Sequence, residues 1–325
     1  MPSDPIIQLN GLSVRLGGRE ILHSLSGELH GAAIGLLGPN GAGKSTLIHT
    51  LLGFFSPSSG GARVLGAPIG GRDKTRLAHL GYMPEYDAYV PGLSGVEFVR
   101  LMAELSGLPA EAALERAHEA LFHAGLGEAR YRRVETYSTG MKQALKLAQA
   151  IVHGPRLVFL DEPTNGLDPA ARRRMLHLIR AMRDGGQTRL VLSSHLLHDV
   201  EEVCDEILIL HRGRIAAIRD LEAERQSRRG YWQVQLAGGA PGAREAWLDE
   251  LRRQGREVGD LPGGRLRIAM PADGSALELY ALAQRYSLQI RRLEPKRDDL
   301  EAIFLRAIEA APAGAPGSEA ISAHS

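Results

Sequence analysis

The sequence predicts an α/β fold in which helices alternate with the strands of a mostly parallel sheet. Three observations predict it. An apolar run at 32–37 stops at a glycine-rich turn, and Lys44 then begins a helix with apolar residues at helical spacing. Residues 157–160 are apolar throughout, as central strands of parallel sheets are. A helix with apolar positions between 175 and 182 separates this strand from the next at 190–192, and such alternation favours a parallel sheet.

Two further strands are expected before the glycine-rich turn. Residues 6–14 alternate between apolar and polar types, residues 15–20 predict a turn, and residues 21–29 form the second strand. Later in the chain, apolar residues at helical spacing predict two or three amphipathic helices, and another helix begins at Met141. We therefore expect a helical insertion over about 94–150, within a first domain that spans residues 1–222.

A second, smaller α+β domain is expected over residues 223–309, after a charged, apolar-poor stretch. Its predicted order, β-α-β-β-α-β, resembles the ferredoxin-like arrangement. The expected elements are a strand at 231–236, a helix at 244–254, a weak strand near 257, a strand at 265–270, a helix at 276–286 and a strand at 288–293. A helix at 299–308 closes the domain, and residues 310–325, rich in Ala, Pro, Gly and Ser, are expected to be disordered.

Composition excludes several classes of protein. The net charge of +1 provides no global field toward nucleic acid, and we expect no nucleic-acid partner. The single cysteine, Cys204, excludes an internal disulfide framework and cysteine-based zinc sites, and it fits a reducing compartment. The N-terminus lacks the pattern of a signal peptide, and no apolar run approaches the roughly 20 residues that span a bilayer. A role at a membrane would therefore need an embedded partner.

The glycine-rich turn matches the Walker A pattern, in which Gly38 and Gly43 are followed by Lys44 and Ser45. Glycines let successive N–H groups converge on phosphate oxygens, and the helix that follows directs its positive dipole end there. We expect Lys44 to reach the β- and γ-phosphates of ATP and the Ser45 hydroxyl to bind Mg²⁺. The strand before the loop and the helix after it argue against a chance match. The candidate nucleotide-binding residues here are Gly38, Pro39, Asn40, Gly41, Ala42, Gly43, Lys44, Ser45 and Thr46.

A second acidic element follows the apolar strand at 157–160. Asp161 and Glu162 end this strand, as in the Walker B pattern. Asp161 is expected to hold Mg²⁺, directly or through water, and Glu162 to polarise the attacking water as a general base. Taken alone, the pair also fits an ordinary acidic turn after a strand.

The ordered set of motifs carries a family resemblance. After the Walker A loop come residues 137–143 (Tyr-Ser-Thr-Gly-Met-Lys-Gln), residues 160–169 (Leu-Asp-Glu-Pro-Thr-Asn-Gly-Leu-Asp-Pro) and residues 193–195 (Ser-Ser-His). Over about residues 6–218 the chain resembles the ATP-binding subunit of ABC transporters. The resemblance implies a P-loop NTPase domain of the ABC type, with its helical insertion, and ATP and Mg²⁺ as cofactors.

The resemblance also implies roles for residues outside the two Walker motifs. In the family, two such domains enclose two ATP molecules, and the phosphate loop of one faces the signature segment of the other. This implies a homodimer in which Ser138 and the backbone N–H groups of Thr139 and Gly140 contact the γ-phosphate across the interface, with Met141 also among the nucleotide-binding residues. Ser138 also fits a simple helix N-cap, and both roles are compatible.

Two downstream residues receive roles in the same way. Asp168 would belong to the segment that joins the two active sites. His195 would contact the γ-phosphate and orient the water and Glu162, although a lone histidine usually has a structural role.

Four positions depart from the family pattern. Leu16 stands where an aromatic residue usually stacks on adenine, so we expect modest selectivity between ATP and GTP. Glu85 replaces the usual glutamine, and its carboxylate remains a candidate Mg²⁺ ligand or a mere surface acid. Thr139 replaces a glycine, so its Cβ is expected to crowd the phosphate, and Ala144 stands where arginine is common. Because Glu162 and His195 are intact, we expect an active ATPase.

The remaining motifs favour a transporter subunit. The chain carries one such domain, unlike soluble translation factors, and lacks the long coiled coils of DNA-repair ATPases. Residues 293–305 resemble the closing segment of ATP-binding subunits of ABC-2 type exporters, which implies a separately encoded ABC-2 type permease and a peripheral location on the cytoplasmic face of the inner membrane. The alternative is a soluble ABC-type regulatory ATPase. The segment that follows Glu85 contains four partly apolar candidates for contact with the permease, which could equally belong to the core of the insertion: Tyr86, Tyr89, Val90 and Leu93.

Overall fold

The computed structural model describes residues 4–70, 75–221, 223, 231–269, 275–296 and 304. The chain divides into two compact units, which are described separately. The described helices and strands of the first unit end before Leu221, and those of the second begin at Tyr231. The expected helix at 299–308 lies outside the described residues except for Phe304, and the segment 310–325 lies wholly outside them. No described helix is long and apolar enough to cross a membrane.

A six-stranded sheet forms the centre of the first unit, as the alternation of strands and helices predicts. Its order is β10-β9-β3-β8-β7-β6, and the strands pair in parallel except β10, which pairs antiparallel with β9. The carboxyl ends of its parallel strands therefore meet at one edge, where open α/β sheets bind ligands. The strands are β3 (Ala33–Leu37), β6 (Leu80–Met83), β7 (Leu157–Asp161), β8 (Arg189–Ser194), β9 (Glu206–His211) and β10 (Arg214–Asp220).

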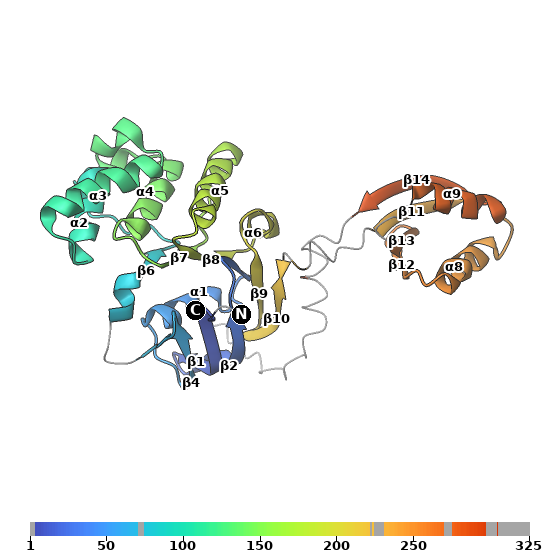
Figure 1. The fold of residues 1–325 in the computed structure, drawn as a ribbon, viewed down its shortest axis with the longest axis horizontal. Coiled ribbons are helices and arrows are strands. Elements are labelled where there is room, and N and C mark those ends of the chain that lie inside the picture. The colour runs from blue at the N-terminus through green and yellow to red at the C-terminus, as the bar shows by residue number, and fades with distance from the viewer. Residues whose placement is uncertain are drawn as a thin grey trace, which may run out of the picture. The chain divides into compact units, whose positions relative to one another are not determined.

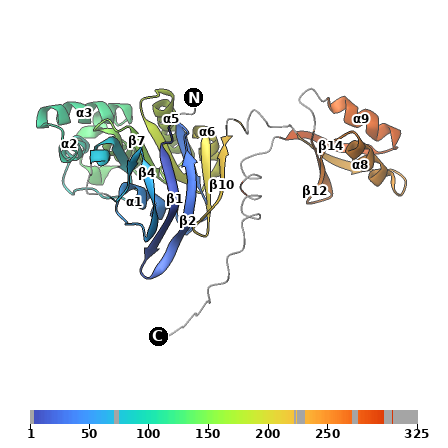
Figure 2. The same cartoon turned by 60° about the horizontal axis from the view of Figure 1, so that its bottom comes forward.

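A second, antiparallel sheet has the order β2-β1-β4-β5. It consists of β1 (Ile7–Leu16), β2 (Arg19–Leu29), β4 (Ser59–Val64) and β5 (Ala67–Pro68). The turn expected at 15–20 is shorter than predicted, because the strands continue to Leu16 and resume at Arg19. Gly17 and Gly18 both have positive φ, which suits a two-residue hairpin turn, so the flanking residues remain in the ladder. Figure 2 shows β1 and β2 beside β10.

Helix α1 (Lys44–Leu52) packs within the core that both sheets share. Its Leu47, Ile48 and Leu51 are buried in one cluster with residues of β1 and β7. Gly53, with φ of 93°, ends the helix in the left-handed conformation. This packing fixes the N-terminus of α1 at the carboxyl edge of the parallel sheet.

The helical insertion has a hydrophobic cluster of its own. It comprises α2 (Gly95–Leu105), α3 (Ala110–His123) and α4 (Thr139–Ile151), with short 3-10 turns at Gly127–Tyr131 and Val134–Thr136. Helix α4 begins two residues earlier than predicted, because the Ser138 hydroxyl caps it by accepting the Met141 N–H. Figure 1 shows these helices together, with α5 (Pro169–Asp184) between them and α6 (Leu197–Val203).

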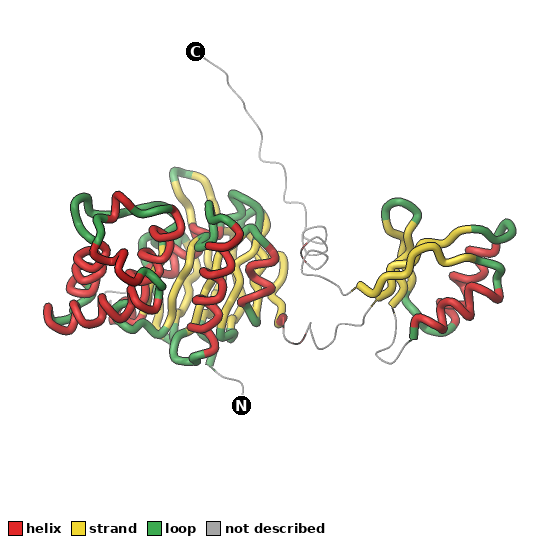
Figure 3. The backbone as a smooth tube through the Cα atoms, turned by 90° about the horizontal axis from the view of Figure 1, so that it is seen from above, coloured by secondary structure: helices red, strands yellow, loops and turns green. Residues whose placement is uncertain are grey.

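The second unit has the element order β-α-β-β-α-β that the sequence predicts. Its elements are β11 (Tyr231–Ala237), α8 (Ala243–Arg253), β12 (Val258–Leu261), β13 (Arg265–Ala269), α9 (Ala276–Arg285) and β14 (Gln289–Lys296). The antiparallel sheet has the order β12-β13-β11-β14. Both helices lie on one side of it (Figure 3). The core of the unit includes the fully buried Trp247 of α8. The unit therefore has its own core.

Candidate functional site

The loop from Gly38 to Gly43 joins β3 to α1 at the carboxyl edge of the parallel sheet. Gly41 and Gly43 have φ of 77° and 104°, a conformation that favours glycine. A Cβ at Gly38 would lie 2.4 Å from the carbonyl oxygen of Leu210 on β9. The glycine pattern is thus required by backbone conformation at two positions and by close packing at the third. The structure places a helix N-terminus directly after this loop, which is a site that favours anions.

Lys44 is the first residue of α1, and its side chain is buried beneath the loop. Its ammonium group donates to the carbonyl oxygen of Gly38 at 2.8 Å and lies 3.8 Å from Oε1 of Glu162. The same side chain thus connects the phosphate loop to the end of β7. An ammonium group with carbonyl and carboxylate partners is held in position for a phosphate group at this edge of the sheet.

Three oxygen-bearing side chains meet beside Lys44. The Ser45 hydroxyl donates to Oδ1 of Asp161 at 3.4 Å, and the Ser193 hydroxyl of β8 donates to the same oxygen. Asp161 is almost completely buried. Hydroxyl and carboxylate oxygens are the ligands that Mg²⁺ prefers, so the donor set fits this ion. Among the described residues, no group of three or more His, Cys, Asp or Glu side chains is placed to hold a metal alone.

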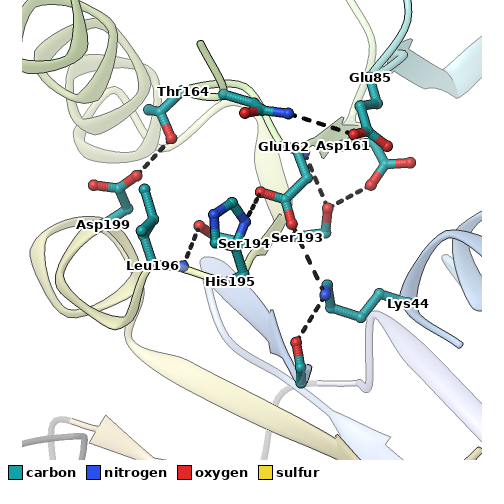
Figure 4. Close-up of polar contacts among 12 residues, drawn as sticks. Lys44, Glu85, Asp161, Glu162, Thr164, Ser193, Ser194, His195, Leu196 and Asp199 are labelled. Atoms are coloured by element: carbon teal, nitrogen blue, oxygen red, sulfur yellow. Dashed lines mark hydrogen bonds and ion pairs between the residues drawn. The ribbon is translucent and has the colours of Figure 1, made fainter. Parts of the chain in front are cut away.

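Glu162 and His195 form the central pair of the cleft (Figure 4). Nδ1 of His195 lies 2.8 Å from Oε2 of Glu162. Burial raises the pKa of Glu162, although His195 and Lys44 oppose the shift by favouring the charged carboxylate. Glu162 has φ of 48°, and its N–H donates to the carbonyl oxygen of Ser193 at 3.2 Å. A buried carboxylate with a raised pKa and a histidine partner has the properties of a general base.

A cleft of about 670 Å³ contains most of the predicted cofactor and catalytic residues. It is lined by residues 40–46 together with Glu85, Glu162 and His195. Leu16, the position expected beside the base, packs partly buried against the core and is not among its lining residues, whereas Ile21 of β2 is. The structure therefore brings together the phosphate loop, the carboxylates and the histidine from four separate sequence segments.

Glu85 lies at the rim of this cleft, in the segment that follows β6. Its Oε1 accepts a hydrogen bond from the Asn165 side chain at 3.4 Å. Asn165 also lines the cleft, and its carbonyl oxygen accepts from the Gln143 side chain of α4 at 3.1 Å. The sequence assigns no individual role to Asn165 or Gln143. Only their positions within residues 160–169 and 137–143, which carry the family resemblance, point to them.

The signature residues are not part of this cleft. Ser138, Thr139, Gly140 and Met141 line a different cavity of about 760 Å³ between α4 and α5, together with Asp168. Asp168 caps α5 by accepting the N–H groups of Ala170 and Ala171 at 2.8 Å, and these bonds lower the pKa of its carboxyl. Within one chain, the predicted site residues thus form two separate groups.

A buried carboxylate behind the site was not predicted from the sequence. Asp199 on α6 is fully buried and accepts from the Thr164 hydroxyl and from the Arg172 guanidinium of α5. Thr164 follows Glu162 by two residues, and Asp199 follows His195 by four. The network therefore joins the segment after β7 to the segment after β8 (Figure 4), which supports the positions of both catalytic candidates.

Comparisons with known proteins agree with this site. Residues 22–165 match the family model described as ABC transporter. The chain is 34% identical over 278 residues to an uncharacterized ABC transporter ATP-binding protein, YxlF, of Bacillus subtilis, covering 85% of this chain and 90% of that protein. It is 33% identical over 213 residues to the Nod factor export ATP-binding protein I of Ralstonia nicotianae, covering 65% and 66%.

A solved structure shares the fold of the first unit. It is the dimeric post-hydrolysis state of an ATP-binding cassette bound to ADP and Pi. Its TM-score is 0.60 at 20% sequence identity, and the match covers 66% of this chain and 98% of that one. The motifs, the site geometry and these relatives thus point to the same family.

Proposed function

Because this chain belongs to the family of ABC transporter ATP-binding proteins, we propose that it hydrolyses ATP to power export through a separately encoded membrane permease. The observation that carries the proposal is the pair Glu162 and His195, 2.8 Å apart in the cleft that contains the phosphate loop. A binding-only domain would not need a general base beside its phosphate site. Family members with export in their names, such as the Nod factor protein, support the direction of transport.

In the proposed reaction, the N–H groups of the phosphate loop and Lys44 hold the phosphates of ATP. Ser45, Asp161 and Glu85 would hold Mg²⁺, which when bound would neutralise charge on the phosphates. Glu162, as the carboxylate, accepts a proton from the attacking water, and His195 keeps that carboxylate oriented.

The second half of each site is proposed to come from another copy of this chain. Ser138, Thr139 and Gly140 lie at the N-terminus of α4, outside the cleft that contains Lys44. A two-fold dimer would bring this N-terminus of one copy to the γ-phosphate bound by the other. The dimeric cassette with the same fold supports this arrangement. Hydrolysis would remove the group that bridges the two copies and let them part.

A surface near Glu85 is proposed to receive an ABC-2 type permease at the cytoplasmic face of the membrane. Tyr86 is 79% exposed and Val90 41% exposed, and Phe54, which follows α1, is 64% exposed. Tyr89 and Leu93 instead pack against the cluster of the insertion. Exposed apolar side chains in this region fit an apolar partner segment. Tyr86 also lines the cleft, so a movement of the partner would reach the site through Tyr86.

The test of hydrolysis is the variant Glu162→Gln. We expect its turnover to fall by about a hundredfold or more, because general-base catalysis contributes that much, while ATP binding persists. In size-exclusion chromatography with ATP and Mg²⁺, the variant should elute as a dimer, and with ADP as a monomer. If the variant hydrolysed ATP at the wild-type rate, Glu162 would not be the general base.

The test of export is association with membranes. The chain should sediment with membrane vesicles only when its permease is co-expressed, and Val90→Glu should weaken this association without changing ATP hydrolysis, because Val90 does not line the cleft. Hydrolysis with no permease-dependent membrane association would instead identify a soluble regulatory ATPase.

A further inference from the structure

Lys146 is a buried lysine that the proposed mechanism does not use. It lies on α4, two turns after the Ser138 cap, and its residue is only 1% exposed. Its ammonium group donates to the carbonyl oxygens of Pro84 at 3.0 Å and of Glu85 at 2.7 Å. The same group lies 3.6 Å from Oδ1 of Asp87. Within the described part of the chain, the hydrogen-bond and ion-pair partners of Lys146 thus belong to one short segment.

The contacts of Lys146 hold the backbone carbonyls of a segment whose Asp87 side chain also accepts from Lys142 of α4 at 3.3 Å and from Tyr89 at 3.1 Å. The segment from Pro84 to Asp87 follows β6 and forms no helix or strand. A buried ammonium group is costly unless its donors are satisfied, and here two peptide carbonyls and a carboxylate satisfy them. Moving either carbonyl away from Lys146 is therefore costly, because the buried ammonium group would lose an acceptor.

These contacts close a ring that starts and ends on α4. Lys146 bonds the backbone of Glu85, and the side chain of Glu85 accepts from Asn165. The carbonyl oxygen of Asn165 in turn accepts from Gln143, which precedes Lys146 by three residues on α4. Residues three apart on a helix lie on one face, so both ends of the ring leave α4 toward the cleft.

We propose that Lys146 is a positioning residue, an inference that rests on the proposed function. Lys146 fastens the segment from Pro84 to Asp87, the Glu85 segment, to α4, the signature helix. It thereby holds the Glu85 carboxylate at the metal end of the cleft. The ring also makes the signature helix and the Glu85 segment move together. A movement imposed on the exposed Tyr86 would then reach the N-terminus of α4 through Lys146.

The variant Lys146→Met in the full chain tests the proposal, because Met fills a similar volume without donors. We expect the Mg²⁺ concentration for half-maximal ATP hydrolysis to rise about tenfold, as for the loss of an outer partner of a metal ligand. Affinity for a fluorescent ATP analogue in EDTA should stay within about twofold of the wild type, since the phosphate loop is untouched. Lys146→Met combined with Glu85→Gln should raise the Mg²⁺ requirement no further than either change alone, because both act through one carboxylate.

A matched control separates positioning from simple support of the insertion. Arg116 on α3 also donates to a backbone carbonyl next to α4, that of Val152, which lies at the C-terminal end of this helix. Arg116→Met should lower the melting temperature and leave the Mg²⁺ requirement unchanged. If both variants shift the Mg²⁺ requirement equally, or if Lys146→Met and Glu85→Gln act additively, Lys146 is only a structural residue.

A second variant keeps the proposal testable if Lys146→Met does not fold. Asn165→Ala opens the ring on its other side and leaves no buried charge, so it should raise the Mg²⁺ requirement in the same non-additive way with Glu85→Gln. An unchanged requirement in a folded Asn165→Ala protein overturns the ring. If the wild type shows no Mg²⁺-dependent hydrolysis at all, the proposed function fails before the ring is tested.

Discussion

At the scale of single residues, Glu162 carries the clearest sign of a functional constraint. Its φ of 48° lies in the left-handed region, which costs on the order of 1–3 kcal/mol for a residue with a side chain. The N–H of Glu162 donates to both the carbonyl and the hydroxyl oxygen of Ser193, and these bonds hold the conformation. The same turn directs the carboxylate toward His195. Strain at this residue therefore coincides with the orientation that the proposed chemistry needs.

Thr139 permits a prediction at the same scale. It is exposed and begins α4, where the resemblance implies a glycine beside the γ-phosphate. Thr139→Gly should raise kcat/KM for ATP a few-fold, because the Cβ that crowds the phosphate is removed, while the helix loses at most about 1 kcal/mol. Thr139→Ala is the matched control, since it keeps the Cβ and removes only the hydroxyl and methyl groups. Equal rates for the two variants would contradict crowding by the Cβ.

The residues of the site fall into two groups: those that neighbouring residues in the sequence identify, and those whose role depends on contacts with distant parts of the chain. The phosphate loop was predictable because its glycines, its lysine and the start of its helix are neighbours in sequence. Asn165, Ser193 and Asp199 were not predicted, because their roles depend on contacts with residues far along the chain. Lys146 gives no sequence signal either, since a lysine on an amphipathic helix usually faces solvent.

At the scale of elements, the same distinction explains two of the strands that are not predicted from the sequence, β4 and β6; β9 and β10 are not predicted either. β4 contains Gly60 and Gly61, which disfavour strands, and it exists because β1 offers a pairing edge. β6 has only four residues and is defined by its parallel pairing with β7. The helical spacing of apolar residues in α1 and α5, by contrast, is visible without the fold. Local pattern thus predicts elements that bury one face, and tertiary pairing decides the short strands.

The junction between α4 and β6 supports a prediction about pH. His153 follows α4, and its Nε2 lies 3.0 Å from the carbonyl oxygen of Leu80. Burial lowers the pKa of His153 in the folded chain below its ordinary value of about 6.5. The unfolded chain therefore binds the proton first as the pH falls below this value, and stability decreases there. Above it, both states are neutral and the residue contributes no pH dependence.

The variant His153→Gln checks this sign. Gln keeps a donor for the Leu80 carbonyl and does not titrate, so its melting temperature should fall less than that of the wild type between pH 7.5 and 5.5. At pH 7.5 and above, the difference in melting temperature between the two proteins should be constant. A parallel decline of both proteins through the acidic range would show that His153 does not titrate in this window.

At the scale of the whole molecule, the two groups of site residues have a geometric meaning. Lys44 and Ser138 both stand at helix N-termini, yet they line different cavities of one chain. In an isologous dimer, two-fold symmetry pairs the phosphate loop of each copy with the signature helix of the other. Each of the two ATP sites would then contain one group from each copy. The second unit has a core of its own.

This division of labour predicts opposite behaviour for two variants in the Glu162→Gln background, where ATP is not consumed. Lys44→Ala should lose both ATP binding and dimer formation, because the ammonium group contacts the phosphates of its own copy. Ser138→Arg should bind ATP as a monomer with an affinity within about twofold of its parent, yet fail to dimerise, because the bulky side chain blocks only the partner's phosphate. Equilibrium binding of a fluorescent ATP analogue and light scattering after size-exclusion chromatography measure the two properties separately. If Ser138→Arg lost ATP binding as a monomer, the signature segment would act within its own chain, and the composite site would be wrong.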